Sequence, residues 1–494
     1  MRQRFVYAFL TLTLAAPCFS QTDVDTLRQQ IQAQQKQIED LQRSIDAQQK
    51  MLQQLTTAPP AAPAAAAPAG ATTAASGPLS FKIGDADFTP GGFMDLTNVF
   101  RTTNVGSGIG TSFTGIPFNN AAAGKLSEDR LSAQNSRISL KVTSEVLGMP
   151  VTGYVESDFL GVQPSNPYVT SNAMTFRMRL YWVDVTRGKL EILGGQSWSL
   201  MTPGRTGISP NPSDIFYTQD MDTNYQAGLV WTRAPQFRLV YHATKQFAAA
   251  VSFENPEQYI GAATVVPSFV GSILDNNGTT NTPNVMPDIQ AKVAYDAKQG
   301  DRQVFHIEAA GVFRTFRIAR PDLSKSTIEG AGGEVNAIAE PVKNVRLIVT
   351  SYYSDAGGRY IGTGIAPDVV VTAAGNLSPV HSGSAIGGFE VQATPKLLVY
   401  GYYSGVYIRR NWGFPASGSA LLGYGYPGGA SNQNRYIGEG TGGFTYSFWK
   451  NPKFGALQWI NQVSYLYRDP WAPVSGGAKA HSAMIWTDLR YVLP

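Results

Sequence analysis

The sequence predicts an all-β transmembrane barrel of about 16 antiparallel strands, preceded by an N-terminal α-helical coiled coil, and three observations lead to this fold class. Only 15% of the 494 residues are charged, whereas 50 are glycine, 24 phenylalanine and 23 tyrosine. A soluble chain normally carries about 25% charged residues. No apolar run of 18 or more residues follows the N-terminus, which argues against a bundle of membrane helices. After residue 79, apolar and polar residues alternate with a period of two, as in strands with one lipid face and one water face.

Residues 1–20 are predicted to be a secretory signal peptide. Arg2 and Arg4 precede an apolar stretch, and the small residues Cys18 and Ser20 follow it. This order is typical of a cleaved export signal. Because the only cysteine lies in this segment, the exported chain is expected to have no disulfide and no cysteine-based metal site.

A periplasmic coiled coil is predicted over residues 21–56. From residue 24 to residue 55 an apolar seam repeats every seven residues, with isoleucine prominent at one core position and two glutamines at the other. Such a helix needs partner helices to bury its seam, and this core composition favours three strands over two. Residues 57–78 are almost entirely Ala, Pro, Thr, Gly and Ser and are predicted to be an extended linker.

Residues 79–494 are predicted to form the outer-membrane β-barrel. Short turns alternate strictly with long loops, and the first strand near 93–100 and the last near 480–493 bring the total to sixteen. The total depends on a turn at 234–236 and on 237–253 being one long strand. The predicted short turns are at 148–150, 187–188, 234–236, 296–301, 341–344, 394–396 and 451–455.

Charged residues on the early strands are the candidate pore lining, because a barrel of this size encloses water. Arg177 and Arg179 lie two residues apart, so both are expected to face the lumen, with Phe176, Met178, Leu180 and Trp182 facing lipid. With Arg137 nearby, two guanidinium forks could hold the two ends of a dianion. An alternative role for this cluster is structural pairing with acids on the next strand. The full set is Arg137, Lys141, Glu156, Asp158, Arg177, Arg179 and Arg238.

The third long loop, predicted over 199–224, is the candidate constriction. Its charged and aromatic residues stand among Pro and Gly, which suits either a segment folded against a polar wall or an exposed loop. The candidate residues are Arg205, Asp214, Tyr217, Asp220 and Asp222.

The order of export signal, coiled coil, linker and barrel resembles the DcaP-type trimeric porins of Gram-negative outer membranes. The motifs that carry the resemblance are GGFMDLTNVFR (91–101), SRISLKV (136–142), GYVESDFLG (153–161), FRMRLYWVD (176–184) and GGQSWSL (194–200). The resemblance implies a homotrimer with periplasmic coiled coils and a channel that passes small anions, dicarboxylates in particular. The C-terminal sequence departs from the aromatic end common in barrels, because the chain ends Tyr491-Val492-Leu493-Pro494.

Other functions have little support in the sequence. The four histidines show no metal-ligand spacing, no phosphate-binding loop opens a helix, and a formal charge of +4 is too small to indicate nucleic acid. The sequence therefore predicts no enzyme activity, no cofactor and no metal. The expected function is that of an outer-membrane porin whose partners are further copies of itself, membrane lipid and small anionic solutes. The alternative is a structural or adhesion protein that tethers the membrane to the cell wall through the coiled coil.

Overall fold

The computed structural model describes residues 79–162, 174–215, 218–221, 225–257, 260, 264–268, 285–413, 421–472 and 474–494, together with residue 35. The predicted signal peptide, linker and, apart from that one residue, coiled coil lie outside the described residues. Among the residues described, no helix has the length and apolar character needed to cross a membrane.

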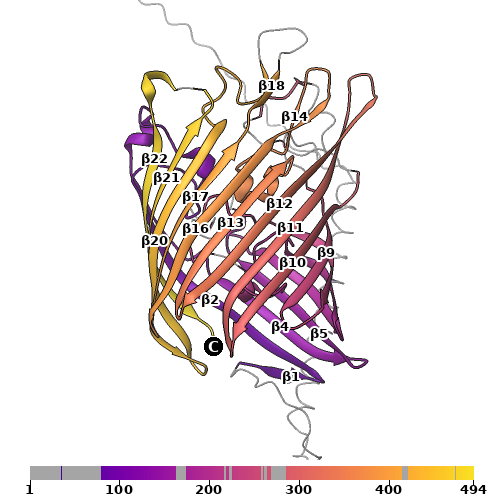
Figure 1. Ribbon diagram of the computed structural model, residues 1–494. Helices are drawn as coiled ribbons and strands as arrows, with labels where there is room; N and C mark the ends of the chain where they lie inside the picture. Colours follow the sequence, from indigo (N-terminus) through magenta and orange to yellow (C-terminus); the bar gives the residue numbers. More distant parts are fainter. Residues whose placement is uncertain are drawn as a thin grey trace, which may run out of the picture. The chain divides into compact units, whose positions relative to one another are not determined.

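The described chain forms a closed antiparallel β-barrel (Figure 1). Barrel strands follow one another around the wall in sequence order, and the last strand pairs with the first, from Phe93 opposite Val492 to Arg101 opposite Met484. The strands of this sheet are β1 (Phe81–Ile83), β2 (Ala86–Arg101), β3 (Glu128–Ser132), β4 (Arg137–Val146), β5 (Met149–Asp158), β6 (Arg177–Arg187), β7 (Leu190–Trp198), β8 (Arg233–His242), β9 (Phe247–Glu254), β10 (Asp288–Gln299), β11 (Arg302–Ala319), β12 (Lys325–Val342), β13 (Val345–Asp355), β16 (His381–Thr394), β17 (Leu397–Ile408), β20 (Asn434–Asn451), β21 (Gly455–Pro470) and β22 (Ala480–Val492).

These eighteen strands occupy sixteen strand positions around the barrel wall, and we call each position a stave. β1 is a short arm that folds back on the start of β2, and β3 and β4 pair with successive parts of β2, so they count as one interrupted stave. Eighteen minus two gives the predicted sixteen. Short elements in the loops are η1 (Phe113–Gly115), η2 (Ala122–Lys125), η3 (Pro212–Asp214), η6 (Gly358–Tyr360), η7 (Gly362–Gly364), β14 (Val369–Val371), β15 (Leu377–Pro379), β18 (Asn411–Gly413), β19 (Leu422–Tyr424) and η8 (Ser475–Gly477).

The predicted strand count is right although one predicted turn is wrong. Residues 234–236, expected to turn because of Pro235, lie inside β8, where Pro235 is opposite Gln196. The turn lies instead at 243–246, which splits the stretch expected to be one long strand. This turn contains neither Gly nor Pro and is closed by Thr244, whose Oγ1 accepts hydrogen bonds from the amides of Gln246 and Phe247 at 3.1 and 3.0 Å. The two errors cancel in the total.

The short turns at one end of the barrel are tight hairpins. In the turn between β4 and β5, Leu147 and Gly148 both have positive φ, 53° and 75°. This is the type I′ geometry that suits the twist of paired strands. The long loops lie at the other end, so the barrel has a turn end and a loop end (Figure 1).

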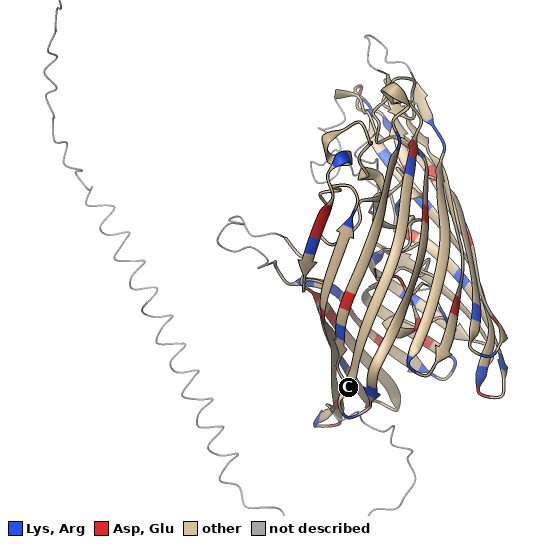
Figure 2. Cartoon of the chain, turned by 90° about the vertical axis from the view of Figure 1, so that its left-hand side faces the viewer, with Lys and Arg blue, Asp and Glu red and all other residues tan. Residues whose placement is uncertain are grey.

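The two faces of the wall differ as the alternation predicts. On β10, Val293 and Tyr295 face outward and are exposed, whereas Gln290 and Lys292 face inward and are buried. Figure 2 shows acidic and basic residues distributed along the strands, between long uncharged stretches. On the described strands, polar side chains therefore lie mainly on the inward face.

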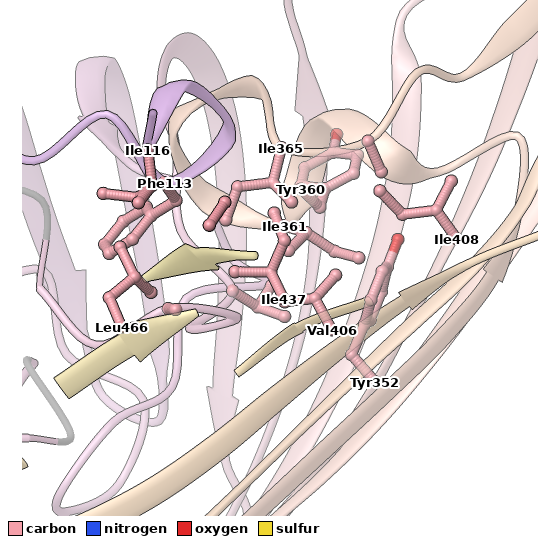
Figure 3. Packing of buried hydrophobic residues seen from close by; sticks show 14 of the residues in the cluster. Phe113, Ile116, Tyr352, Tyr360, Ile361, Ile365, Val406, Ile408, Ile437 and Leu466 are labelled. Atoms are coloured by element: carbon pink, nitrogen blue, oxygen red, sulfur yellow. The ribbon is translucent and has the colours of Figure 1, made fainter. Parts of the chain in front are cut away.

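Loops fold into the loop end of the barrel and form an apolar core there (Figure 3). Phe113 and Ile116 of the first loop (102–127) and Tyr360 of the sixth loop (356–380) are fully or almost fully buried. They belong to one cluster with inward residues of β13, β17, β20 and β21, including Val406 and Leu466. These two loops therefore fill part of the lumen at its loop end.

Candidate functional site: the charged lumen

The predicted charged residues of β4, β5 and β6 come together on the inner wall, and two of the arginines are tightly paired. Arg177 binds Asp158 with two hydrogen bonds, Nε to Oδ1 at 2.9 Å and Nη2 to Oδ2 at 2.7 Å. Arg179 bridges the two acids of β5, with Nη1 2.7 Å from Asp158 Oδ2 and Nε 2.6 Å from Glu156 Oε1. Arg179, Glu156 and Asp158 are buried, so this network joins two neighbouring strands of the wall.

A β-bulge at Arg179 changes which residues of β6 face the lumen. Across β5 and β6, Glu156 is opposite Leu180 but Ser157 is opposite Met178, so Arg179 is an extra residue in β6. A bulge of this kind shifts the alternation of the strand by one position. Phe176 and Met178 face outward as expected, but Leu180 and Trp182 are 0% and 4% exposed and face inward. The prediction that Leu180 and Trp182 face lipid is therefore wrong, because both follow the bulge.

The neighbouring strand β7 accommodates the bulge through a glycine. Gly195 lies opposite Trp182 and has a φ of 131°, a backbone angle that residues other than glycine rarely adopt. A Cβ at this position would lie 2.4 Å from the carbonyl oxygen of Tyr181, so no larger residue fits. The GGQSW motif thus serves the packing of β7 against β6.

Arg137 approaches a tyrosine of the third loop, which spans residues 199–232. Its Nη2 donates to the hydroxyl of Tyr225 at 3.4 Å, and its guanidinium lies 5.2 Å from the ring centre of Phe93. Tyr225 is a non-glycine residue with a φ of 58°, a conformation that costs free energy and persists only where surrounding contacts impose it. Burial would raise the pKa of the Tyr225 hydroxyl, but the positive charges of Arg137 and Arg179 outweigh it and lower that pKa. The potential at this hydroxyl is therefore positive.

Arg233, at the start of β8, completes a basic and aromatic cavity on the loop side of Tyr225. Trp198 lies close to two cations, with the guanidinium of Arg179 5.6 Å and that of Arg233 5.3 Å from its ring centre. The Nη1 of Arg233 is buried without a hydrogen-bond acceptor in the described part of the chain. The loop-side cavity has a volume of about 290 Å³, and its lining includes Arg177, Arg179, Trp198, Tyr225, Trp231 and Arg233.

A second cavity of about 270 Å³, the central cavity, meets the same tyrosine. Arg137, Arg205, Asp220 and Arg490 line it together with Tyr225. Arg205 is held by Glu390 of β16, with distances of 2.5 Å from Nη2 to Oε1 and 3.0 Å from Nη1 to Oε2. Because Tyr225 lines both cavities, its ring lies between them.

The third loop crosses the lumen and is fastened to the far wall through its backbone. Seven backbone N–H groups in the described part of this loop donate to side chains that point inward from β9, β10, β11, β17, β20 and β21. These bonds measure 2.6 to 3.2 Å, close to the usual range for N–H to oxygen. The pairs are Leu200 with Glu254, Met201 with Gln290, Gly204 with Glu308, Gly207 with Asp296, Gln219 with Tyr402, Met221 with Gln462 and Ala227 with Glu439.

The other predicted site residues lie apart from this cluster. Lys141 lines a cavity nearer the turn end, of about 310 Å³, together with Asp184, Glu191 and His242. Arg238 is buried beneath the third loop, where its Nη2 donates to the carbonyl oxygen of Trp198 at 2.6 Å.

Within the third loop, Asp214 closes a local turn. Its carbonyl oxygen accepts from the Arg205 amide at 2.7 Å, and its Oδ2 accepts from the Ser209 hydroxyl at 2.9 Å. Tyr217 and Asp222 lie outside the described residues, so their expected place in the constriction stays a prediction.

Three ionisable residues of the two cavities were not predicted from the sequence: Tyr225, Arg233 and Arg490. Tyr225 follows the predicted end of the loop by one residue, and Arg233 was next to the misplaced turn at 234–236. Arg490 could have been found, because it alternates with Leu489 and Tyr491 on the last strand. Across the described ranges, no group of three His, Cys, Asp or Glu side chains is arranged to hold a metal ion.

A closed antiparallel barrel of sixteen staves, with a loop crossing its polar interior, has the fold of the outer-membrane porins. The structure is similar to the crystal structure of the outer membrane channel DcaP of Acinetobacter baumannii, with a TM-score of 0.60 and 15% sequence identity over 82% of this chain and 97% of that chain. A weaker similarity joins it to an anion-selective porin from Comamonas acidovorans, with a TM-score of 0.48 and 12% identity over 83% of this chain and 100% of that chain. No protein-family model and no curated protein matches the sequence. At these identities the likeness is one of fold, and the sequence resemblance to DcaP-type porins agrees with it.

Proposed function

We propose that this protein is an outer-membrane porin, a water-filled channel through which small hydrophilic solutes diffuse passively, with a preference for anions such as dicarboxylates. The barrel fold and the polar inward faces support a channel, since sixteen staves enclose more space than side chains fill. The loop end would face outward and the turn end the periplasm, as in barrels with short periplasmic turns.

The anion preference is supported by a difference between the acids and the bases of the lumen: the acids have binding partners, whereas two of the arginines have no carboxylate in contact. Glu156 and Asp158 are neutralised by arginines, and the acids of the far wall accept hydrogen bonds from the third loop. Arg137 and Arg233 differ, because neither has a carboxylate oxygen within 4 Å in the part of the chain that the structure describes. These two cations line the cavities on either side of Tyr225. An anion crossing this point would meet, in each cavity, an arginine that is not in direct contact with a carboxylate.

The strength of each contact is expected to be small. A guanidinium binds a carboxylate with two parallel hydrogen bonds, but in a wet lumen an exposed ion pair contributes only ~0–1 kcal/mol. Weak sites suit a channel, since a solute has to leave as readily as it enters. The pairing of Arg177 and Arg179 with acids moves the main role in selectivity from these two residues to Arg137 and Arg233.

The test is the zero-current potential of the purified protein in planar bilayers under a salt gradient. We expect anion preference in the wild type and a shift toward cation preference in Arg137→Gln/Arg233→Gln. Block by a small dicarboxylate should weaken up to about fivefold, the effect of about 1 kcal/mol. Arg187→Gln is the matched control, because Arg187 ends β6 at the turn end and is exposed. A cation-selective wild type, or a double variant with unchanged potential and block, would refute the anion preference.

The channel is proposed to act as a homotrimer whose predicted coiled coils stand in the periplasm. Deleting residues 21–78 should weaken the trimer without unfolding the barrel, because the heptad seam needs partner helices. Native mass in mild detergent and heat-modified mobility in gels would measure the two effects. The alternative role as a cell-wall tether predicts a barrel that conducts no ions, so the same bilayer recordings distinguish the two functions.

A further inference from the structure

The hairpin turns at the turn end of the barrel are rich in basic residues. Six of the seven turns contain at least one lysine or arginine, and Figure 2 shows basic residues at this end. Asp301 is the only acidic residue in these six segments, which cover residues 187–189, 243–246, 298–302, 343–344, 395–396 and 450–454. The basic residues, which we call the turn-end basic arc, are Arg187, Lys189, Lys245, Lys298, Arg302, Lys343, Lys396, Lys450 and Lys453.

The lysines of the turn-end basic arc are not neutralised by acids of this chain. None of the seven has a carboxylate oxygen within 4 Å among the residues that the structure describes. Lys189 and Lys396 donate to backbone carbonyl oxygens, at 2.7 and 3.2 Å, and these bonds leave the positive charge uncompensated. At the loop end, by contrast, the exposed Arg435 forms an ion pair with Asp469. The turn end therefore presents positive charge that an external anion could neutralise.

Five of these lysines stand within two residues of a large, exposed apolar side chain. The pairs are Lys189 with Leu190, Lys245 with Phe247, Lys343 with Val342, Lys450 with Trp449 and Lys453 with Phe454. In the last pair, the ammonium nitrogen lies 5.4 Å from the ring centre. The apolar surface of the wall therefore extends to the turns, and the positive charge begins where that surface ends.

This order of apolar surface followed by lysine suits the boundary of a membrane. The carbon stem of lysine lies along apolar surface while its ammonium group reaches the polar headgroups. Anionic lipids give a membrane surface a negative potential, which favours their contact with a nearby lysine or arginine about fivefold for each basic residue. The basic residues are spread over the hairpins from β6 to β21, which suits a shell of several lipids better than one bound molecule.

We propose that the turn-end basic arc binds the phosphate groups of anionic phospholipids, such as phosphatidylglycerol, in the membrane leaflet at the turn end. The inference rests on the proposed placement of the barrel in the outer membrane, where the periplasmic leaflet would supply these lipids. It goes beyond channel function, because solutes cross the lumen whereas these lipids contact the outside of the wall. Lipid binding is measured without ion current, so a failure of the channel function and a failure of lipid binding are separate results.

The first test measures which lipid collects around the purified protein in phosphatidylcholine vesicles. Trace amounts of spin-labelled phosphatidylglycerol or spin-labelled phosphatidylcholine are added, and electron paramagnetic resonance gives the fraction of each that the barrel immobilises. We expect the wild type to favour phosphatidylglycerol severalfold. Lys245→Gln/Lys343→Gln/Lys453→Gln should reduce this preference about twofold or more, because it removes three uncompensated charges. Equal immobilisation of the two lipids by the wild type would overturn the proposal.

The matched control removes three exposed lysines from the loop end, in Lys125→Gln/Lys325→Gln/Lys479→Gln. It changes the net charge by the same amount and should retain the wild-type preference. Heat-modified mobility in gels checks that both triple variants are folded. Equal losses in the two triple variants would show that net charge and not the turn-end basic arc sets the preference, and would reject the proposal.

Two further measurements complete the test. In the wild type, the preference for phosphatidylglycerol should fall when salt is raised from about 0.1 M to about 1 M, because the Debye length shortens from about 10 Å to about 3 Å. A preference that does not change with salt would overturn the proposal without any variant. Sedimentation with purified cell-wall sacculi tests the other anionic surface at this end. If the turn-end triple variant loses binding to sacculi but keeps the wild-type lipid preference, the arc binds the cell wall and the lipid proposal is wrong.

Discussion

Removing one wall acceptor should loosen the third loop by an amount that the structure allows us to work out. Glu439 of β20 accepts a hydrogen bond from the Ala227 amide at 2.8 Å, and both residues are almost completely buried. A hydrogen bond to a charged group contributes about 1.5–3 kcal/mol. Glu439→Leu should therefore raise the population of the released loop segment by roughly 10- to 100-fold, since each 1.4 kcal/mol is a factor of ten. Glu439→Gln keeps an acceptor and should lose less than about 1.5 kcal/mol.

Hydrogen exchange followed by mass spectrometry measures this effect in the peptide that covers residues 225–232. Exchange should be fastest in Glu439→Leu, intermediate in Glu439→Gln and slowest in the wild type. Thr441→Val is the matched control, because Thr441 is buried on the same strand but bonds Ser464 of the wall at 2.9 Å and not the loop. Equal exchange in wild type and Glu439→Leu, with the barrel still folded, would refute the view that wall acids hold the loop.

Three further predictions concern the lumen. Tyr225→Ala should join the loop-side and central cavities and raise single-channel conductance, whereas Tyr225→Phe keeps the ring and should leave conductance unchanged. In the wild type, Arg314 lies 2.9 Å from Asp288 and 2.8 Å from Asp368. Arg314→Met leaves both carboxylates buried without this shared partner and should lower the free energy of unfolding by about 3–5 kcal/mol. The temperature at which the mobility in gels changes measures this, and a shift equivalent to less than about 1 kcal/mol would contradict it. Deleting residues 205–220 should raise conductance, and a folded deletion variant with wild-type conductance would show that the loop does not narrow the channel.

The sequence predicted the barrel because the physics of a strand that separates lipid from water is local. Period-two alternation, turn residues and low charge identified sixteen staves and the residues near both ends of the closed wall. The turn at 243–246 was missed because its closing group is the Thr244 hydroxyl, which gives a weaker sequence signal than Pro235. Local propensity therefore located the strands better than it located this turn.

The candidate site was predictable only in part, because its details depend on contacts between distant residues. Alternation placed Arg177 and Arg179 on one side of a strand, and hairpin order placed Glu156 and Asp158 beside them. The bulge at Arg179, by contrast, depends on the register between β5 and β6. The contact of Tyr225 with Arg137 joins residues 88 positions apart, and no pattern within either segment indicates it.

In the third loop, the backbone holds the loop against the wall, whereas the side chains are left to determine which solutes pass. The wall side chains bind peptide N–H groups, which nearly every residue type supplies, so most side chains of the loop can change without loss of these bonds. Proline is unsuited to the seven donor positions, because it has no N–H, and Gly207 has a φ of 51°, which favours glycine. New charged or aromatic side chains can therefore be introduced between the donor positions of the loop. They would alter the passage through the lumen while the barrel wall and its hydrogen bonds to the loop stay the same.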